Sequence, residues 1–130
     1  MKNKHPGVSC LYKFIDAFNT AEKNNIITNL HFPHYVHSNG NEPVIYKNGE
    51  DFWKSLSVQL DTMIKVENWS FSTLDKCKII NKTDKTLQCE VHFNRRLINN
   101  KSYGSAKGIW ICTNRDGIWA LQLRSMIPVS

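Results

Sequence analysis

The sequence predicts an α+β domain in which three helices of the N-terminal half close over a cone-like, strongly bent antiparallel sheet. In the first half, apolar residues recur at intervals of three and four, which is the period of a helix with one buried side. From Trp69 onward the period falls to two, which is typical of strands with one buried face. Long twisted strands tend to coil, so we expect the helices to cover a concave surface and to leave a pocket there.

The first helix is predicted over residues 8–22, and the polar segment 1–7 before it is expected to be disordered or loosely held. The domain therefore spans residues 8–130. A second short helix follows Asn24 and Asn25 and ends at Pro33, whose ring clashes with a preceding helical turn. The third helix is predicted over residues 50–66, where apolar residues again follow helical spacing.

The remaining segments are predicted to be strands. Residues 35–37 and 43–46 flank a turn that contains Gly40, which predicts a small hairpin. Four longer strands are expected at residues 69–81, 86–98, 103–114 and 117–127. Because their connections are short and rich in turn formers, we expect them to pair as an antiparallel meander.

Length and composition indicate one globular domain without a membrane segment. The chain has 130 residues, of which 41% are hydrophobic and 22% charged, so a sizeable core can be buried and a disordered chain is excluded. The apolar runs are too short to cross a bilayer, and the first residues lead into no apolar signal region. We therefore expect a cytoplasmic protein with no membrane partner.

The cysteines and the basic charge favour ordinary structural roles. Cys10, Cys77, Cys89 and Cys112 lack metal-ligand spacing and lie within or beside apolar segments, so they are predicted to be reduced core thiols rather than nucleophiles. The net charge is +6, but the lysines are dispersed and form no nucleic-acid motif. Specific nucleic-acid binding is therefore not expected.

Five short segments, in this order and at these separations, resemble a known superfamily over almost the whole chain. They are Ala17-Phe18-Asn19, Leu30-His31-Phe32-Pro33-His34, Val91-His92-Phe93-Asn94-Arg95, Asp116-Gly117-Ile118-Trp119 and Arg124-Ser125. With them the sequence resembles the nuclear transport factor 2-like superfamily, a cystatin-like roll, and within it the SnoaL-like branch. It departs from many relatives at Thr20-Ala21-Glu22, near which they carry an Asp.

The resemblance implies a cone formed by a bent sheet, a small-molecule cavity at its wide end, and frequent homodimers through sheet surfaces. It does not imply one activity. The superfamily includes ketosteroid isomerases, polyketide cyclases, dehydratases, epoxide hydrolases and members without chemistry, so fold analogy alone does not assign a function.

Histidines are the first candidates for chemistry. His34 is placed at the cavity mouth, where an imidazole that titrates near neutrality could act as a general base; the alternative is a His bonded to backbone at a turn. His31, His34 and His37 are spaced by three, but Pro33 breaks the helix that would bring them together. We expect no metal site and no cofactor.

Charged residues supply two further candidates. Arg95 shares the strand phase of the apolar residues before it, so it should point inward and meet a ligand carboxylate, an enolate or a protein acid. Asp16 lies one position off the apolar stripe of the first helix and would be a raised-pKa base if it faced the cavity, or an ordinary exposed acid if it did not. Arg96 and Arg124 are expected to face solvent or a dimer interface.

Aromatic residues complete the predicted site. Ligand contacts are assigned to Tyr12, His31, Trp53, Trp69 and Tyr103, while the other tryptophans are assigned to the core or an interface.

Three functions are compatible with these residues. The first is a proton-transfer isomerase, cyclase or dehydratase acting on an apolar small molecule, with His34 or Asp16 as base and Arg95 stabilising negative charge. The second is a non-catalytic ligand-binding or dimerisation module of the same fold. The third is a nucleic-acid binder, which would require the scattered lysines to converge into one patch.

Overall fold

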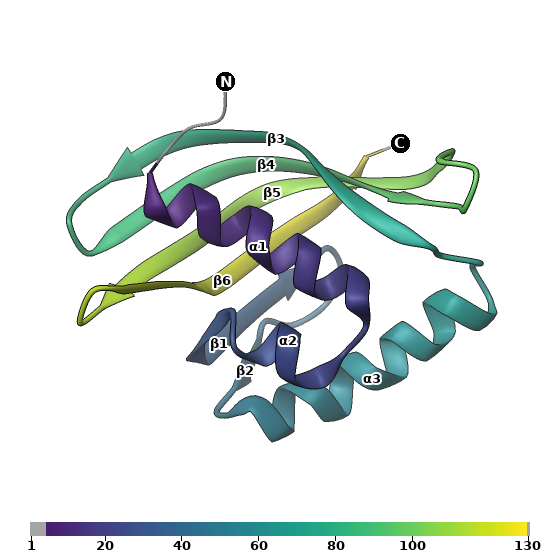
Figure 1. Ribbon diagram of the computed structural model, residues 1–130, viewed down its shortest axis with the longest axis horizontal. Coiled ribbons are helices and arrows are strands. Elements are labelled where there is room, and N and C mark those ends of the chain that lie inside the picture. The colour runs from purple at the N-terminus through teal and green to yellow at the C-terminus, as the bar shows by residue number, and fades with distance from the viewer. Residues whose placement is uncertain (1–4, 130) are drawn as a thin grey trace.

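A computed structural model describes residues 5–129 of the chain (Figure 1). Of the predicted loose lead, residues 1–4 lie outside the described residues. Three helices and six strands follow in the order α1 (Pro6–Thr20), α2 (Lys23–Ile27), β1 (Leu30–Ser38), β2 (Val44–Tyr46), α3 (Gly49–Lys65), β3 (Phe71–Lys82), β4 (Thr86–Arg96), β5 (Ser102–Arg115) and β6 (Ile118–Val129). None of these helices is both long and apolar enough to cross a membrane.

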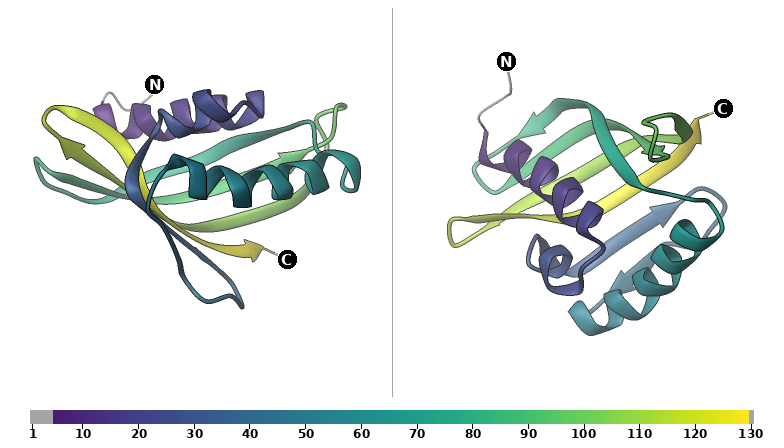
Figure 2. Two further views of the ribbon diagram at one scale, coloured as in Figure 1. Left: turned by 90° about the horizontal axis from the view of Figure 1, so that it is seen from below. Right: turned by 45° about the vertical axis from the view of Figure 1, so that its right-hand side comes forward.

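All six strands belong to one sheet, in the order β2-β1-β6-β5-β4-β3. Strands β3 to β6 form the predicted antiparallel meander, and β1 and β2 form the predicted hairpin with Val36 opposite Val44. Strand β1, which follows α2, pairs with β6 in parallel, so one strand pair of the sheet is not antiparallel. Figures 1 and 2 show the sheet curled, with α1 lying across the strands β3 to β6 and α3 lying beside α2 and β2.

Helix α1 begins two residues earlier than predicted. The side chain of His5 caps the helix by accepting a hydrogen bond from the backbone N–H of Gly7 at 2.9 Å, and Pro6 occupies the first turn, where its missing N–H costs nothing. The predicted apolar stripe is buried against the sheet, with Leu11 and Phe14 almost fully enclosed. The helix ends at Thr20, where Ala21 adopts a left-handed conformation with φ 55°.

Helix α2 is shorter than the sequence predicts, and the prediction that Pro33 ends it is wrong. The helix ends at Ile27, and Leu30 already belongs to β1. The backbone N–H of Leu121 in β6 donates to the carbonyl of Asn29 at 3.2 Å, so pairing with β6 begins just before β1. A contact between segments far apart in the sequence therefore overrides the local helical pattern.

The four cysteines are free thiols, as predicted. Cys10, Cys89 and Cys112 are buried and Cys77 is half-buried. The thiol of Cys10 donates to the carbonyl of Trp119 at 2.6 Å, which helps to hold α1 against β6.

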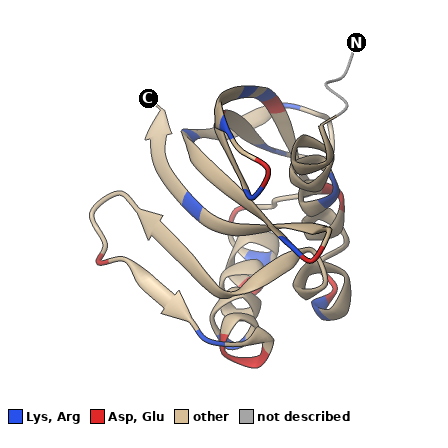
Figure 3. Ribbon diagram, turned by 90° about the vertical axis from the view of Figure 1, so that its left-hand side faces the viewer, with Lys and Arg blue, Asp and Glu red and all other residues tan. Residues whose placement is uncertain are grey.

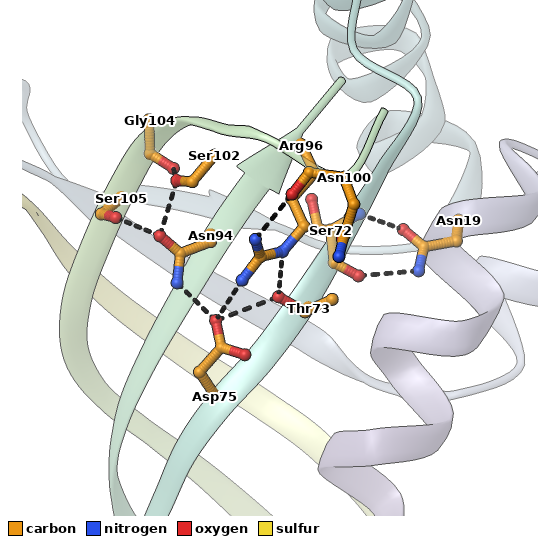
Figure 4. A network of polar contacts seen from close by, with 10 residues as sticks. All are labelled: Asn19, Ser72, Thr73, Asp75, Asn94, Arg96, Asn100, Ser102, Gly104 and Ser105. Atoms are coloured by element: carbon orange, nitrogen blue, oxygen red, sulfur yellow. Dashed lines mark hydrogen bonds and ion pairs between the residues drawn. The ribbon is translucent and has the colours of Figure 1, made fainter. Parts of the chain in front are cut away.

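The end of α1 is fixed to the edge of the sheet by the side chain of Asn19. Its Nδ2 donates to the carbonyl of Ser72 at 2.9 Å, and its Oδ1 accepts from the backbone N–H of Ser72 at 2.8 Å (Figure 4). Since β3 is an edge strand, Asn19 takes the place of a missing neighbouring strand there.

Replacing Asn19 is expected to loosen this contact. Asn19→Ala leaves the backbone groups of Ser72 without their partner, so the free energy of unfolding should fall by about 1–3 kcal/mol in urea titrations. Asn19→Asp keeps the acceptor and loses the donor, and should have a smaller effect. Equal stability of the wild type and Asn19→Ala would contradict the prediction.

Candidate functional site

A cavity of about 360 Å³ lies between α1 and the inner face of the sheet. Phe14 and Phe18 of α1 form one wall, and Phe93, Trp110 and Met126 of the central strands form the other. This volume lies within the ordinary range for small-ligand pockets. Five aromatic side chains, of Phe14, Phe18, Phe93, Tyr103 and Trp110, belong to its lining. No Asp, Glu or His side chain between residues 5 and 129 lines the cavity.

Arg95 lines the cavity, as the alternation of β4 predicts. Its guanidinium lies 3.6 Å from Glu67, a residue between α3 and β3. Tyr103 of β5 also lines the cavity and donates its hydroxyl to the same carboxylate at 2.7 Å. Burial, reinforced by the hydrogen bond to Glu67, raises the pKa of Tyr103, so the phenol stays protonated and acts as a donor. Arg95 therefore has a protein acid as its partner, which is one of the predicted possibilities.

Arg124 also lines the cavity, and the prediction that it faces solvent or a dimer interface is wrong. The cause is a bulge in β6. Cys112 lies opposite Leu121 and Ile111 lies opposite Leu123, so Gln122 is an extra residue without a partner on β5. The bulge reverses the alternation of β6, so that Arg124 pairs with Trp110 and shares its inward orientation.

The surroundings of Arg124 are aromatic and contain no counterion. The residue is 9% exposed, and its guanidinium carbon lies 5.0 Å from the ring centroid of Phe14, 5.9 Å from Phe52 and 6.0 Å from Trp110. Its Nε is buried without a hydrogen-bond partner, and no acid in the described chain forms an ion pair with it. Burial lowers the pKa of Arg124 to about 10, so the side chain is still a cation at neutral pH.

His34 is in the interior of the protein and not at the cavity mouth, and it is absent from the cavity lining. Its ring is 0% exposed and contacts the rings of Phe32 and Phe52, with centroid distances of 6.2 and 5.3 Å. Burial and, to a smaller extent, the positive charge of Arg124 lower the pKa of His34 to about 3. The nearby backbone of Leu121 acts in the opposite direction, but neither ring nitrogen of His34 forms a hydrogen bond of normal geometry. The neutral, enclosed ring has no access to a ligand proton.

The other two clustered histidines point to different partners. Nδ1 of His31 lies 2.9 Å from the hydroxyl of Thr113, and Nδ1 of His37 lies 2.9 Å from that of Ser125. Within residues 5–129, no three His, Cys, Asp or Glu side chains lie close enough together to hold a metal ion. His31 also lies outside the cavity lining.

None of the remaining predicted site residues lines the cavity in the described chain. Asp16 is exposed on α1, because the helix turns it away from its apolar stripe. Tyr12 and Trp53 are partly buried and pack against the core. Trp69 is buried behind the wall, where its ring contacts Phe18 at 5.7 Å and its Nε1 donates to Ser72 at 3.0 Å. Of the five predicted ligand contacts, only Tyr103 lines the cavity in the described chain.

Sequence reasoning missed Trp110 and Arg124. Trp110 and Cys112 are two residues apart in β5 and therefore share one side of the strand, which could have indicated from the sequence that the tryptophan faces inward. Arg124 gives no such local signal, because the bulge at Gln122 depends on how β6 pairs with β5. Arg96, by contrast, faces away from the cavity as predicted and bonds to Thr73 and Asp75 (Figure 4).

No protein-family model matches the sequence, and no curated protein sequence matches it. Solved structures do match. A nuclear transport factor 2-like protein with a cystatin-like fold from Novosphingobium aromaticivorans has a TM-score of 0.74 and 8% identity, over 94% of this chain and 79% of that one. A nuclear transport factor 2-like protein from Cytophaga hutchinsonii has a TM-score of 0.71 and 13% identity, over 99% and 100% of the two chains.

A third match is a ketosteroid isomerase-like protein from Erwinia carotovora atroseptica, with a TM-score of 0.66 and 10% identity over 96% of this chain and 95% of that one. At these identities the matches establish architecture and not activity. The curled sheet with its covering helices, the element order and these superpositions together show that the chain has the nuclear transport factor 2-like, cystatin-like fold.

Proposed function

We propose that this chain is a non-catalytic small-molecule-binding domain whose ligand occupies the cavity beneath α1. The observation that carries the proposal is the cavity itself, about 360 Å³ in volume, whose lining includes five aromatic side chains and two arginines. Apolar walls with a few oriented polar groups are the usual construction of a ligand site. The site fits an apolar body of one or two rings.

The composition of the lining favours binding over proton transfer. A general base must lie within hydrogen-bond reach of the proton that it removes. His34 is enclosed elsewhere in the interior and Asp16 is exposed on the outer side of α1, so neither reaches the cavity. Tyr103 is a bonded phenol whose raised pKa makes it a poor base. The isomerase, cyclase or dehydratase chemistry considered for the SnoaL-like branch therefore has weaker support than binding.

Dye binding tests the proposal. The neutral naphthalene dye prodan should bind to the wild type with enhanced and blue-shifted fluorescence, because it transfers from water into an apolar site. Ala106→Trp places a large ring among the lining residues and should reduce dye affinity at least tenfold.

The matched control is Lys107→Trp, which adds the same ring at the next, exposed position of β5. This variant should bind the dye as the wild type does, and circular dichroism checks that both variants are folded. Equal dye affinity in all three proteins would contradict binding in the cavity.

We further propose that the protein forms a homodimer through the outer face of the sheet. We also propose that it acts in the cytoplasm and does not bind nucleic acids specifically. Ile109 and Ile127, on neighbouring strands and opposite in phase to the inward residues, are 44% and 48% exposed. Figure 3 shows Lys and Arg spread over several strands and helices, with Asp and Glu among them, which is unfavourable for a phosphate-binding surface. Sedimentation tests the dimer: the wild type should sediment as a dimer, and Ile109→Glu, which places a charge on this face, should sediment as a monomer.

A further inference from the structure

Arg124 presents a buried positive charge for which the described residues supply no counterion. Moving an ion of this kind out of water is unfavourable unless a counterion and hydrogen bonds compensate it. Contacts with the faces of three aromatic rings stabilise the cation, but its Nε still has no hydrogen-bond partner in the described chain. A bound anion would supply both the acceptor and the negative charge that Arg124 lacks.

The groups around Arg124 do not supply that anion. Phe14 comes from α1, Phe52 from α3 and Trp110 from β5, and none of these rings carries charge. The phenol of Tyr46 on β2 also acts on Arg124, but its hydroxyl keeps its proton and donates to Ser55 at 3.0 Å. On β1, His34 is neutral because burial lowers its pKa to about 3. Arg95 is the other cation of the cavity, and Glu67 already pairs with it.

A second unpaired donor lines the same cavity. Trp110 is 1% exposed, and its buried Nε1 has no hydrogen-bond partner in the described chain. Trp110 stands directly opposite Arg124 in the pairing of β5 with β6, and both residues line the cavity. An indole N–H and a guanidinium can only donate, so the group that complements them must be an acceptor, and beside an unpaired cation it should be an anion.

We infer that the ligand of this cavity is an apolar carboxylic acid whose carboxylate binds to Arg124 while its one- or two-ring body lies against the aromatic walls. The inference rests on the proposed function, that the cavity binds a small molecule, and adds the chemical class of the ligand. A planar carboxylate matches the fork of a guanidinium and can accept two hydrogen bonds from it. A cavity of about 360 Å³ accommodates such an acid beside the rings.

A matched pair of probes tests the inference, with binding measured by calorimetry at pH 7. The probes are 2-naphthoate and 2-naphthalenemethanol, which share the bicyclic body and differ in the anionic group. Wild-type protein should bind naphthoate at least tenfold more tightly than the alcohol. Arg124→Met, which keeps an apolar chain of similar length, should lose this preference and bind both probes with similar affinity.

Two further measurements separate binding from a structural role of Arg124. Arg96→Met removes a cation that faces away from the cavity and should keep the preference for naphthoate. Without ligand, Arg124→Met should unfold at the same urea concentration as the wild type or at a higher one, because an uncompensated buried charge has been removed.

The outcomes distinguish the two proposals. If prodan binds in the cavity but naphthoate binds no more tightly than the alcohol, the carboxylate inference is overturned and the binding function stands. If Arg124→Met keeps the preference for naphthoate, Arg124 is not the anchor. If neither prodan nor either naphthalene probe binds, the proposed function fails as well.

Discussion

Acidification from pH 6.5 towards pH 3 is expected to destabilise the fold through His34 by about 1.4 kcal/mol for each pH unit. The ring takes up a proton below pH 6.5 in the unfolded chain but only near pH 3 in the folded chain, because burial and the charge of Arg124 oppose the cation. Between these values the unfolded state binds more protons. The contribution that the neutral His34 ring makes to the free energy of unfolding is therefore fully present above pH 6.5 and is lost as the pH falls towards 3.

Urea unfolding at several pH values measures this effect. His34→Phe and His34→Leu cannot take up the proton, so their stability should fall less steeply than that of the wild type between pH 6.5 and 4, with a difference of about 3 kcal/mol accumulated over that interval. Both variants also remove two ring nitrogens that lack well-formed hydrogen bonds, which favours the folded state. Parallel profiles for the wild type and His34→Phe would show that the enclosed ring does not control the acid response.

Gly108→Ala is expected to be among the most damaging single substitutions in this fold. A Cβ at position 108 would overlap the carbonyl oxygen of Ser125 and approach the Cα of Met126 at 3.0 Å, and both are backbone atoms of β6. Backbone cannot rotate away as a flexible side chain can, so the β5–β6 pair would have to separate. We expect a loss of about 3 kcal/mol or more in the free energy of unfolding.

Gly104→Ala provides the matched control for this prediction. Gly104 lies in the same strand and also lines the cavity, but a Cβ there would meet nothing within 4 Å. Its stability in urea should stay close to that of the wild type. If the two alanine variants unfold at the same urea concentration, the close approach of β5 and β6 at Gly108 is not a constraint on the fold.

Separation of these strands should also affect the site. Gly108 lies two residues from Trp110 in β5, and Met126 lies two residues from Arg124 in β6. Trp110, Arg124 and Met126 all line the cavity. The close packing at Gly108 therefore helps to hold the two unpaired donors side by side.

The sequence predicted the parts of this protein that depend on local periodicity. The apolar stripe of α1, the helical spacing of α3 and the alternation of β4 each report which side of one element is buried, so they also placed Arg95 in the cavity. The burial of three cysteines followed from their apolar neighbours. Turn residues between the long strands predicted the antiparallel meander.

The parts that sequence reasoning misplaced depend on contacts between distant segments. From sequence alone, Asp16 and His34 could each be assigned to a cavity. The position of Asp16 around its helix and that of His34 beside a turn do not determine which residues pack over them. In the structure Asp16 is turned outward, and Phe32 and Phe52 enclose His34. The parallel pairing of β1 with β6 likewise joins strands that are more than seventy residues apart.

By itself, the sequence determined that the chain builds helices over a curled sheet and that a cavity with an inward arginine results, because side-chain periodicity is a property of each element alone. Tertiary structure decided which arginine is left without a partner. One unpaired residue, Gln122, reverses the phase of β6 and turns Arg124 from the outer face to the cavity. That reversal is set by the register between two strands, and register is a relation between segments that no single stretch of sequence contains.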